Sequence, residues 1–305
     1  MSNSILTNTS AMTALQTLNA TNKSLDATQE RISTGLRVSG AEDNAAYWSI
    51  ATTMRSDNGA LSAVQDALGL GAATVDTMYT AMNSTVDVMK EIKNKLVAAK
   101  EPGLDRAKIQ SDITELQNQL KSISDSAVFN SENWLSSDPA TTPTKSIVSS
   151  FSRDSSGAVQ IETIDVDLAG IQLFDTAGAN TGILDSNITI GANVSGANVS
   201  DFDISAVTDA DLSGLDSLIG DVDAALSSIT DAATNLGSIK TRIDLQNDFI
   251  SALTDAIDRG IGQLVDADMN EESTRLKALQ VQQQLGIQAL SIANSGSQSI
   301  LSLFQ

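Results

Sequence analysis

The chain contains 305 residues and carries a formal net charge of −20, with neither His nor Cys. Such an acidic chain is a poor candidate for binding nucleic acid, because phosphate binding requires clustered Lys and Arg side chains. The lack of His and Cys removes the usual metal ligands and the commonest nucleophile and base pairs, so we expect no enzyme activity and no cofactor.

The amino-terminal segment is predicted to be an amphipathic helix. No charged residue occurs between Met1 and Asn22. Apolar and amide side chains nevertheless recur at steps of four and three from Ala11 to Ile32, which is the spacing of one helix face. The first twenty residues lack a positive side chain and a continuous apolar run, so we expect neither a signal peptide nor a membrane anchor.

A connector from Ser33 to Asn44 leads into a much longer predicted helix, which Asp43 or Asn44 can cap. Apolar residues recur every seven positions from Tyr47 to Leu96, and Ile50 begins a companion row three positions further on. A seven-residue repeat held this long predicts a helix packed along one face against a partner helix, about 80 Å long at ~1.5 Å per residue.

The long helix must end at Pro102-Gly103, because Pro lacks an amide hydrogen and disfavours helix at the residue before it. Apolar residues then step by four and three from Ile109 to Ala127. This spacing predicts a third, shorter helix packed on the long one.

The middle of the chain, from Ser131 to Asp211, has twelve acidic and only two basic residues. Two segments rich in β-branched residues, Ser146–Phe151 and Ala158–Leu168, flank a turn sequence at Asp154–Gly157, which predicts a hairpin. A further strand is expected at Gly182–Ile190. The region resembles a small, acidic, surface-facing insertion.

The seven-residue repeat returns from Leu215 to Leu264 over the same number of steps. Equal lengths favour one antiparallel pair of long helices, while two unrelated amphipathic helices in a bundle are the alternative. The residues assigned to this rod seam are Met54, Leu61, Leu68, Val75, Met82, Met89, Leu96, Val222, Ile229, Leu236, Ile243, Ile250, Ile257 and Leu264.

The carboxy-terminal segment mirrors the amino terminus, because no charged residue occurs from Ala278 to Gln305 and a helical repeat begins at Leu276. Its density of Ser, Thr, Asn and Gln argues against a transmembrane helix. We expect both ends to be buried against other subunits, with amides available for hydrogen bonds; loosely ordered tails are the alternative. The expected self-assembly core consists of Leu15, Leu18, Leu25, Ile32, Leu276, Leu279, Ile287, Leu290 and Leu301.

Other candidate sites are weak. Asp165 and Asp167 lie on one face of a predicted strand, but no His or Glu loop accompanies them, so a solvated acidic face is favoured over a Ca²⁺ site. Asn-x-Ser/Thr triplets, such as those at Asn83, Asn187, Asn193 and Asn198, are expected by chance in a chain this rich in these residues. The glycines at Gly69–Ala72 lie inside the helical repeat without a Lys, which excludes a phosphate loop.

The segment Arg31–Ala51 (RISTGLRVSGAEDNAAYWSIA) resembles the hallmark segment of bacterial flagellins. The opening Ser4–Met12 and the ending Ser291–Gln305 are similar to the termini of that family. Tyr47–Asp57 and Ala63–Ala72 resemble its alphaproteobacterial branch in particular. The resemblance covers roughly the first 135 and the last 95 residues.

This resemblance implies a mainly α fold, in which a long antiparallel coiled-coil rod of terminal helices carries a small β-containing central insertion. It implies an inner filament-core domain from residues 1–36 and 268–305, a rod domain from 37–130 and 212–267, and a variable surface insertion at 131–211. It further implies export without a signal peptide through a type III apparatus, a secretion chaperone, and contacts with filament cap and junction proteins.

In some flagellins the long and third helices carry an epitope for an innate immune receptor. The resemblance aligns Val88 with an Arg of receptor-active members, Ile92 with a shared apolar residue and Asp112 with a Glu. Loss of a multi-donor Arg contact predicts weak or absent receptor activation.

We therefore expect a flagellin: a structural subunit that self-assembles into the extracellular helical filament used for swimming, alone or with sister flagellins, without nucleic acid or membrane insertion. A hook–filament junction protein of the same export system is the alternative. A coiled-coil signalling rod would require charged ends and a hairpin tip in mid-rod, and an enzyme is the least favoured reading.

Overall fold

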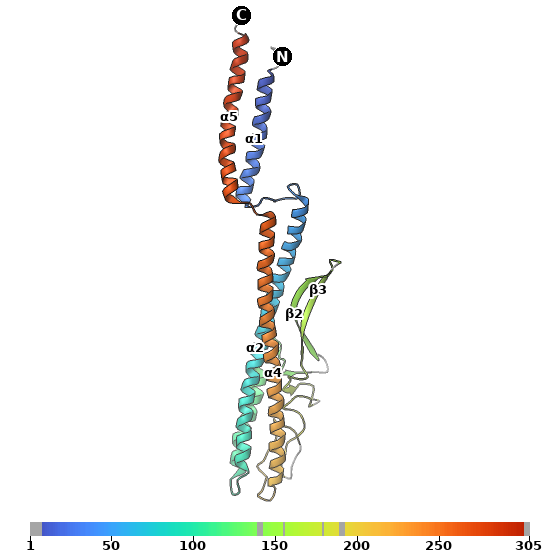
Figure 1. Cartoon of the computed structure of the whole chain (residues 1–305). Helices are drawn as coiled ribbons and strands as arrows, with labels where there is room; N and C mark the ends of the chain where they lie inside the picture. Colours follow the sequence, from blue (N-terminus) through green and yellow to red (C-terminus); the bar gives the residue numbers. More distant parts are fainter. Residues whose placement is uncertain (1–7, 139–142, 155, 179, 189–192, 302–305) are drawn as a thin grey trace. The chain divides into compact units, whose positions relative to one another are not determined.

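A computed structural model describes residues 8–138, 143–154, 156–178, 180–188 and 193–301, the last five by their backbone only. The described helices are α1 (Thr9–Thr34), α2 (Ala45–Ala99), α3 (Arg106–Ser126), α4 (Leu212–Val265) and α5 (Met269–Leu301). The strands are β1 (Ser136–Ser137), β2 (Thr144–Arg153), β3 (Val159–Asp167) and β4 (Phe174–Asp175). Long helices near both ends of the chain and a small strand-containing centre (Figure 1) confirm the predicted fold class.

The chain divides into two compact units, and α2 and α4 contribute residues to both. The terminal unit comprises residues 1–59 and 255–305, and the middle unit comprises residues 60–254. The bounds of the five predicted domain segments stay predictions.

In the middle unit, α2 and α4 run antiparallel. Polar pairs that bridge the two helices include Gln65 with Asn247, at 3.0 Å between Nε2 and Oδ1, and the ion pair Lys100–Asp216 at 2.5 Å. Between them lies a dry row of seam residues, each at most 2% exposed: Leu61, Leu68, Val75, Met82, Met89, Leu96, Val222, Ile229, Leu236, Ile243 and Ile250. Seven-residue spacing brings these side chains onto one face, so each helix covers the apolar row of the other.

The connection between α2 and α3 is stabilised by the buried, positively charged side chain of Arg106. The helix ends at Ala99, before Pro102-Gly103, as predicted. Arg106, at the start of α3, is buried and donates from Nε to the Ala99 carbonyl (3.0 Å) and from a guanidinium nitrogen to the Asp209 carboxylate (2.7 Å). This hydrogen bond from Arg106 lowers the pKa of Asp209. One side chain thus ties the end of α2 and the start of α3 to the segment preceding α4.

The predicted hairpin is present, with β2 and β3 paired antiparallel and a register shift between Val148 and Ser150. Its turn is organised by Asp154, whose Oδ1 accepts from the Ala158 amide at 2.9 Å. Gly157 adopts a φ of +83°, a left-handed conformation that is strained for residues with a Cβ. The hairpin turn therefore forms at the residues where the sequence predicted it.

The strand expected at Gly182–Ile190 is not formed: residues 183–185 make a turn, Asn187 pairs with Asn198 only in an isolated β-bridge, and 189–190 lie outside the described residues. The amides of Ile183 and Leu184 donate to the carbonyls of Gln172 and Leu173, which directs Leu184 into a buried position. The residues buried here are Gly182 and Leu184, while the β-branched Ile183 and Ile188 are half-buried, so the segment forms a compact loop and not a strand.

The acidic region between residues 131 and 211 contains a substantial apolar core. Leu135, Leu173, Phe202 and Ile204 are all at most 1% exposed. Two buried glutamines of α3, Gln110 and Gln117, each donate to the Phe202 carbonyl at 3.1 Å. Much of this region is therefore packed on α3, although the sequence suggested a surface-facing insertion.

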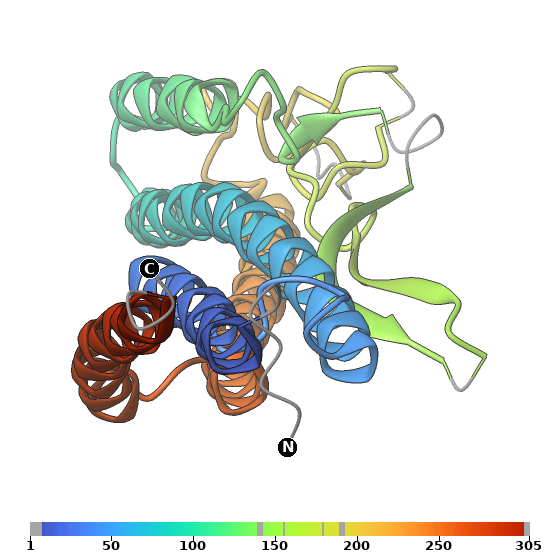
Figure 2. The ribbon, with the colours of Figure 1, turned by 90° about the horizontal axis from the view of Figure 1, so that it is seen from above.

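In the terminal unit, α1 and α5 lie side by side and antiparallel (Figures 1 and 2). The α1 helix begins at the cap Asn8, whose Oδ1 accepts from the Ala11 amide, and ends at the left-handed Gly35. The end of α4 meets the start of α2 in a small apolar cluster of Val38, Ala51, Ile261 and Val265.

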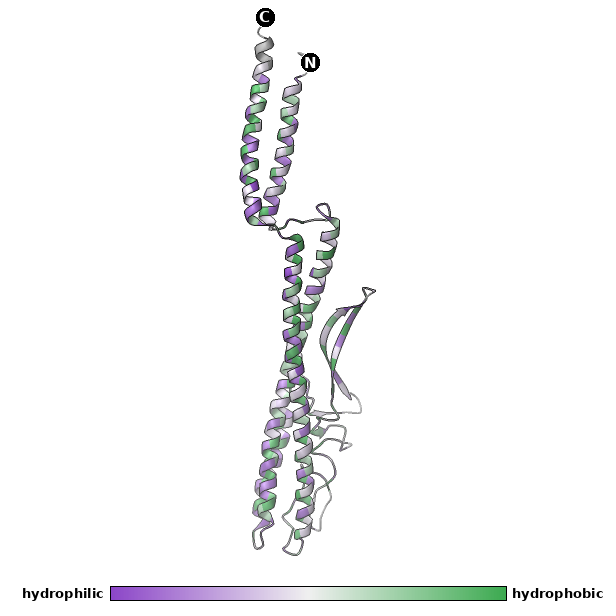
Figure 3. Cartoon of the chain, in the orientation of Figure 1, coloured by the Kyte–Doolittle hydropathy of each residue, from purple (hydrophilic) through white to green (hydrophobic). Residues whose placement is uncertain are grey.

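Hydropathy varies along every described helix, and polar residues interrupt the apolar ones on α1 and α5 (Figure 3). Within the part of the chain that the structure describes, no helix combines the length and apolarity that a bilayer crossing requires.

Candidate self-assembly surface

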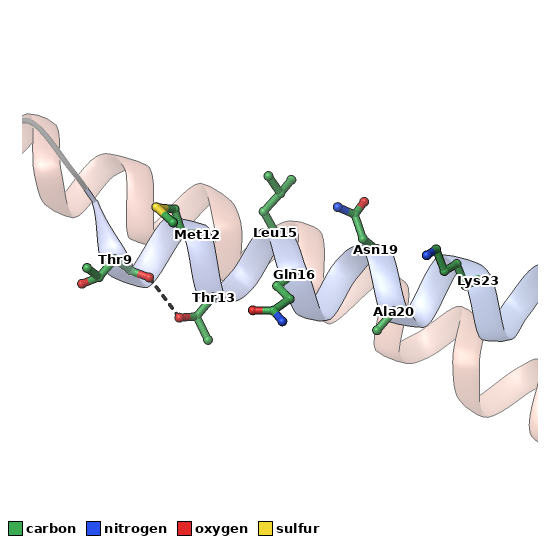
Figure 4. A pocket seen from close by; sticks show the side chains of 8 residues that line it. All are labelled: Thr9, Met12, Thr13, Leu15, Gln16, Asn19, Ala20 and Lys23. Carbon is green, nitrogen blue, oxygen red and sulfur yellow. Dashed lines mark hydrogen bonds between the residues drawn. The ribbon is translucent and has the colours of Figure 1, made fainter.

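The uncharged first half of α1 presents an open groove. Met12, Leu15 and Asn19 project from the same side of the helix (Figure 4), and the side chains of Met12 and Leu15 are 63% and 48% exposed. The groove is lined by Thr9, Met12, Thr13, Leu15, Gln16, Asn19, Ala20 and Lys23. Large apolar side chains displayed together on a helix surface favour contact with another protein.

A second groove runs between α1 and α5. Its lining consists of small, hydroxyl and apolar residues: Ser10, Thr13, Ala14, Thr17, Gly286, Ala289, Ile292 and Ala293. A Cβ at Gly286 would lie 3.3 Å from Cδ1 of Leu18, so the two helices approach closely at this point. Close approach of these small residues leaves a groove of mixed polarity between the two helices.

The outer face of α5 carries a stripe of exposed apolar residues, Val281, Leu285 and Ile292. No charged residue lies within this face from residue 278 onward. This stripe was not predicted, because the apolar row that begins at Leu276 lies on another face of the helix. The spacing of four residues from Val281 to Leu285 and of seven from Leu285 to Ile292 is itself typical of a second apolar helix face.

The structure places the predicted self-assembly residues in several environments. Leu25 is buried, while Leu18, Ile32, Leu276, Leu279 and Leu290 are half-buried. Leu15 and Ile287 are exposed, and the side chain of Leu301 lies outside the described residues.

Gly286 faces α1 in place of Ile287. The row from Leu276 predicts a step of four from Gln283 to Ile287, but the structure continues with a step of three, to Gly286. Because a glycine allows a closer helix contact than an isoleucine, the pair adopts the register in which Gly286 meets Leu18. Ile287 is thereby left 54% exposed.

The contact between α1 and α5 includes polar pairs. Gln283 donates from Nε2 to Oδ1 of Asn22 at 2.8 Å, and Asn8 donates to the Ala293 carbonyl at 2.9 Å. Near the other end of the pair, the buried Glu272 carboxylate lies 3.3 Å from Arg31. These contacts set the alignment of the two helices, because a shifted register would leave the polar groups unpaired.

The rod-seam residues are less buried in the terminal unit than in the middle unit. There Met54, Ile257 and Leu264 are only half-buried. Tyr47 and Ile50, which begin the repeat, are exposed. The seven-residue repeat therefore extends beyond the residues that are fully covered within one chain.

The three predicted immune-epitope positions do not form one exposed patch. Val88 and Ile92 are buried, and only Asp112 is exposed. The Asp112 carboxylate accepts from Lys95 at 2.5 Å, and this hydrogen bond raises the pKa of Lys95.

Asp165 and Asp167, for which a solvated acidic face was favoured over a Ca²⁺ site, bind neighbouring groups of the chain. Asp165 bonds through Oδ1 to the Ser146 hydroxyl, at 2.7 Å, and Asp167 accepts from the Ala169 amide. Among the described residues, no group of three or more acidic side chains is arranged to hold a metal ion.

Family models match both helical regions of the chain. The model of the bacterial flagellin N-terminal helical region matches residues 5–139, and that of the C-terminal helical region matches residues 219–304. The matched segments contain all five described helices in whole or in large part, and they leave most of the central region outside.

Similar curated proteins cover nearly the whole chain. Flagellin A of Rhizobium meliloti strain 1021 is 49% identical over 393 aligned positions, which cover 99% of this chain and 100% of that protein. Flagellin C of the same strain is 53% identical over 322 positions, with 99% of each chain covered. A flagellin of Brucella melitensis is 46% identical over 303 positions, again with 99% of each covered.

The crystal structure of Bacillus cereus flagellin is similar to 62% of this chain and 88% of that one, with a TM-score of 0.39 and 18% identity. The assignment rests on the sequence relationships: two matched terminal regions and identity near 50% along the whole chain. The chain belongs to the bacterial flagellin family, in the branch represented by these alphaproteobacterial relatives.

Proposed function

We propose that this chain is the structural subunit of a bacterial flagellar filament used for swimming, and that it acts by self-assembly and not by catalysis. The observation that carries the proposal is the uncharged, partly exposed apolar surface of α1 and α5, in a chain whose relatives are named flagellins. Burial of exposed apolar area between copies supplies the driving force, roughly 25 cal/mol per Å² removed from water.

The surface chemistry of the helix pair suits a multi-subunit contact. A monomer that exposes Met12, Leu285 and Ile292 on long helices keeps apolar area in water, which contact with other copies removes. The Asn and Gln side chains of the same helices can bond across subunits or face a water-filled lumen. The self-assembly core predicted from the sequence is in this way extended to the outer stripe of α5.

The junction-protein alternative is not favoured, because the chain matches flagellins over 99% of its length. Rhizobium meliloti has several flagellins, A to D, so co-assembly with sister flagellins fits the family. We further propose an extracellular location in the filament, export by the flagellar type III apparatus with a secretion chaperone, and contact with filament cap and junction proteins.

Seeded polymerisation tests the proposal. Purified full-length chain is mixed with short filament seeds and imaged by electron microscopy, in parallel with a variant truncated before Ala278. We expect long filaments from the full chain and none from the truncated chain, which should retain the helical circular dichroism of the middle unit. Short caps from the full chain would favour a junction protein, and filaments from the truncated chain would contradict the role of α5.

We also predict weak activation of the innate immune receptor that recognises some flagellins. Val88 offers no hydrogen-bond donor, and Asp112 is already paired with Lys95. A cell reporter assay on monomers, with a receptor-active flagellin as the positive control, is expected to give little signal. Full activation at matched concentration would refute this expectation.

A further inference from the structure

The methionines of the chain differ in how far water reaches their sulfur atoms. Met78, Met82 and Met89 lie in the helix pair of the middle unit and are fully buried. In the terminal unit, Met12 is 63% exposed on α1 and Met269 is 43% exposed at the start of α5. Oxidation of a methionine to its sulfoxide requires access to the sulfur, so among the described methionines these two are the most open to dissolved oxidants.

Met12 lies in the open groove on the uncharged half of α1. Its side chain projects from the same side of the helix as Leu15 and Asn19 (Figure 4). Its backbone amide donates to the Asn8 carbonyl at 3.0 Å, within the capped first turn of the helix. The thioether is thereby held at a fixed place on an open surface, where a small oxidant can reach it from solvent.

Met269 offers a comparison, because its surroundings are charged. It is the first residue of α5 and follows Asp268, whose carboxylate accepts from the Asn270 amide at 2.8 Å. Glu271 and Arg275 form an exposed ion pair on the same turns of the helix. A sulfoxide at Met269 therefore joins a polar, hydrated surface, whereas the first half of α1 carries no charge.

The reaction needs an oxidant but no catalytic group of the protein. A lone pair of the Met12 sulfur attacks one oxygen of hydrogen peroxide, so that an S–O bond forms and the O–O bond breaks. The second oxygen leaves as hydroxide, which takes the proton from the oxygen now bound to sulfur and becomes water. Sulfur loses two electrons and the peroxide gains them. The product is a polar sulfoxide in place of an apolar thioether.

A sulfoxide on this surface opposes assembly. In the free subunit the new oxygen stays in water, but contact with another copy removes it from water, which costs free energy unless a donor is found. The contact also loses the apolar contribution of the thioether. Because the Met12 side chain is largely exposed in the monomer, its oxidation should weaken association far more than it weakens the folding of α1.

We propose that Met12 is an oxidative modification site: a peroxide-class oxidant converts its thioether to the sulfoxide in the free subunit, and the modified subunit joins the polymer poorly. This inference rests on the proposed function and adds a chemical control to it. Reductases that act on methionine sulfoxide reverse the modification. Oxidation of Met269, by contrast, leaves growth of the polymer unaffected.

Peroxide treatment of the monomer, followed by seeded growth, tests the proposal. Full-length chain is exposed to graded hydrogen peroxide, freed of the oxidant and added to filament seeds, while peptide mass spectrometry reports the sulfoxide at each methionine. We expect Met12 and Met269 to be oxidised before Met78, Met82 and Met89. The critical concentration should rise about tenfold as the Met12 sulfoxide accumulates.

Two substitutions assign the effect to one sulfur atom. Each variant is compared with its own untreated sample, so that differences in growth before treatment cancel. Met12→Leu keeps an apolar side chain without sulfur, and its critical concentration should not respond to peroxide. Met269→Leu, the matched control, should respond as the wild type does. Leucine is a good helix former, and circular dichroism checks the helical content of every sample.

Reduction of the oxidised wild type provides a second measurement, which needs no substitution. A mixture of methionine sulfoxide reductases that covers both epimers of the sulfoxide should restore the original critical concentration. Recovery of growth together with loss of the Met12 sulfoxide in the mass spectrum excludes irreversible damage to the chain as the cause.

The outcomes separate the two proposals. Growth that is lost with Met12 oxidation, is insensitive to peroxide in Met12→Leu and returns on reduction supports the modification site. Unchanged growth of a wild type whose Met12 is fully converted, or an equal loss of growth in Met12→Leu, overturns it and leaves the filament function intact. Failure of the untreated wild type to extend seeds overturns the proposed function, and the modification site with it.

Discussion

The middle and terminal units are built from similar long helices but use their apolar residues differently. In the middle unit the seam residues of α2 and α4 are fully buried within one chain. In the terminal unit, α1 and α5 half-bury one apolar row and expose another, including Leu285 and Ile292. The middle unit therefore derives its stability from its own core, while the terminal unit retains apolar surface that none of its own described residues covers.

Charge follows the same division. The terminal unit has seven basic and eleven acidic residues, whereas the middle unit has eleven basic and twenty-seven acidic residues. The net charge is therefore −4 for the terminal unit and −16 for the middle unit. Like charge keeps the middle units of separate chains soluble and apart, and the smaller net charge of the terminal unit opposes close contact less. Separating these properties between two units allows one chain to be soluble before assembly and cohesive after it.

The largest expected effect comes from a carboxylate on the outer face of α5. Leu285→Asp should raise the critical concentration for seeded growth by at least about 100-fold, because burying an unpaired charge costs several kcal/mol. Leu245→Asp is the matched control: Leu245 is exposed on α4 between Asp244 and Asp248, where charge is already present. Equal growth of both variants, measured by light scattering, would remove the distinction between the two surfaces.

Core truncations should separate the units by stability. Leu236→Ala, in the fully buried seam, is expected to lower the free energy of unfolding by about 2–5 kcal/mol, through lost burial and the cavity left behind. Leu279→Ala, at a half-buried position of α5, should cost less than about 1.5 kcal/mol in the monomer. Urea unfolding followed by circular dichroism measures both, and similar losses would mean that α1 and α5 pack as tightly as the seam.

A smaller loss in the free energy of unfolding is expected when the buried positive charge of Arg106 is removed. Arg106→Met removes the donor to the Ala99 carbonyl and one donor to the Asp209 carboxylate, which should cost about 1–3 kcal/mol. Lys108→Met, at an exposed Lys two residues along α3, is the control and should change stability by less than about 0.5 kcal/mol. Unchanged thermal unfolding of the Arg106 variant would show that the α2–α3 connection does not depend on this side chain.

The smallest expected effect is a dependence of folding stability on pH, through the carboxylate of Asp209. The Arg106 hydrogen bond places the native pKa of Asp209 below its ordinary value of 3.8. The stabilisation is therefore fully present above that value and is lost as the pH falls through the native pKa. The stability advantage of wild type over Asp209→Asn should shrink between pH 6 and pH 3 in urea titrations. Asp231→Asn, at an exposed position of α4, serves as the control, and a gap that widens with acid would contradict the assignment.

Much of the fold could be predicted from local patterns. The repeat through Met82 and Ile229, the break at Pro102 and the turn at Asp154–Gly157 each specify an element by short-range chemistry. The strand expected at Gly182–Ile190 was wrong because β-branched residues also suit a compact loop. There the long-range bonds to Gln172 and Leu173 decide the conformation.

The candidate surface was only partly predictable. Periodicity identified apolar faces at both ends of the chain, but it assigned Ile287 to the row that Gly286 occupies and overlooked Val281 and Leu285. Close helix packing selected the register, because a residue without a Cβ permits a shorter distance between helices than the neighbouring Ile.

Short-range patterns in the sequence specify where helices begin and end, which of their faces are apolar and how charge is distributed, because these depend on residues close together in the chain. Which apolar faces are covered from within, as at Leu68, and which stay open, as at Trp48, depends on the tertiary fold. A hydrophobic repeat records that a face must leave water, whereas the identity of the surface that covers it depends on contacts between distant segments or separate chains.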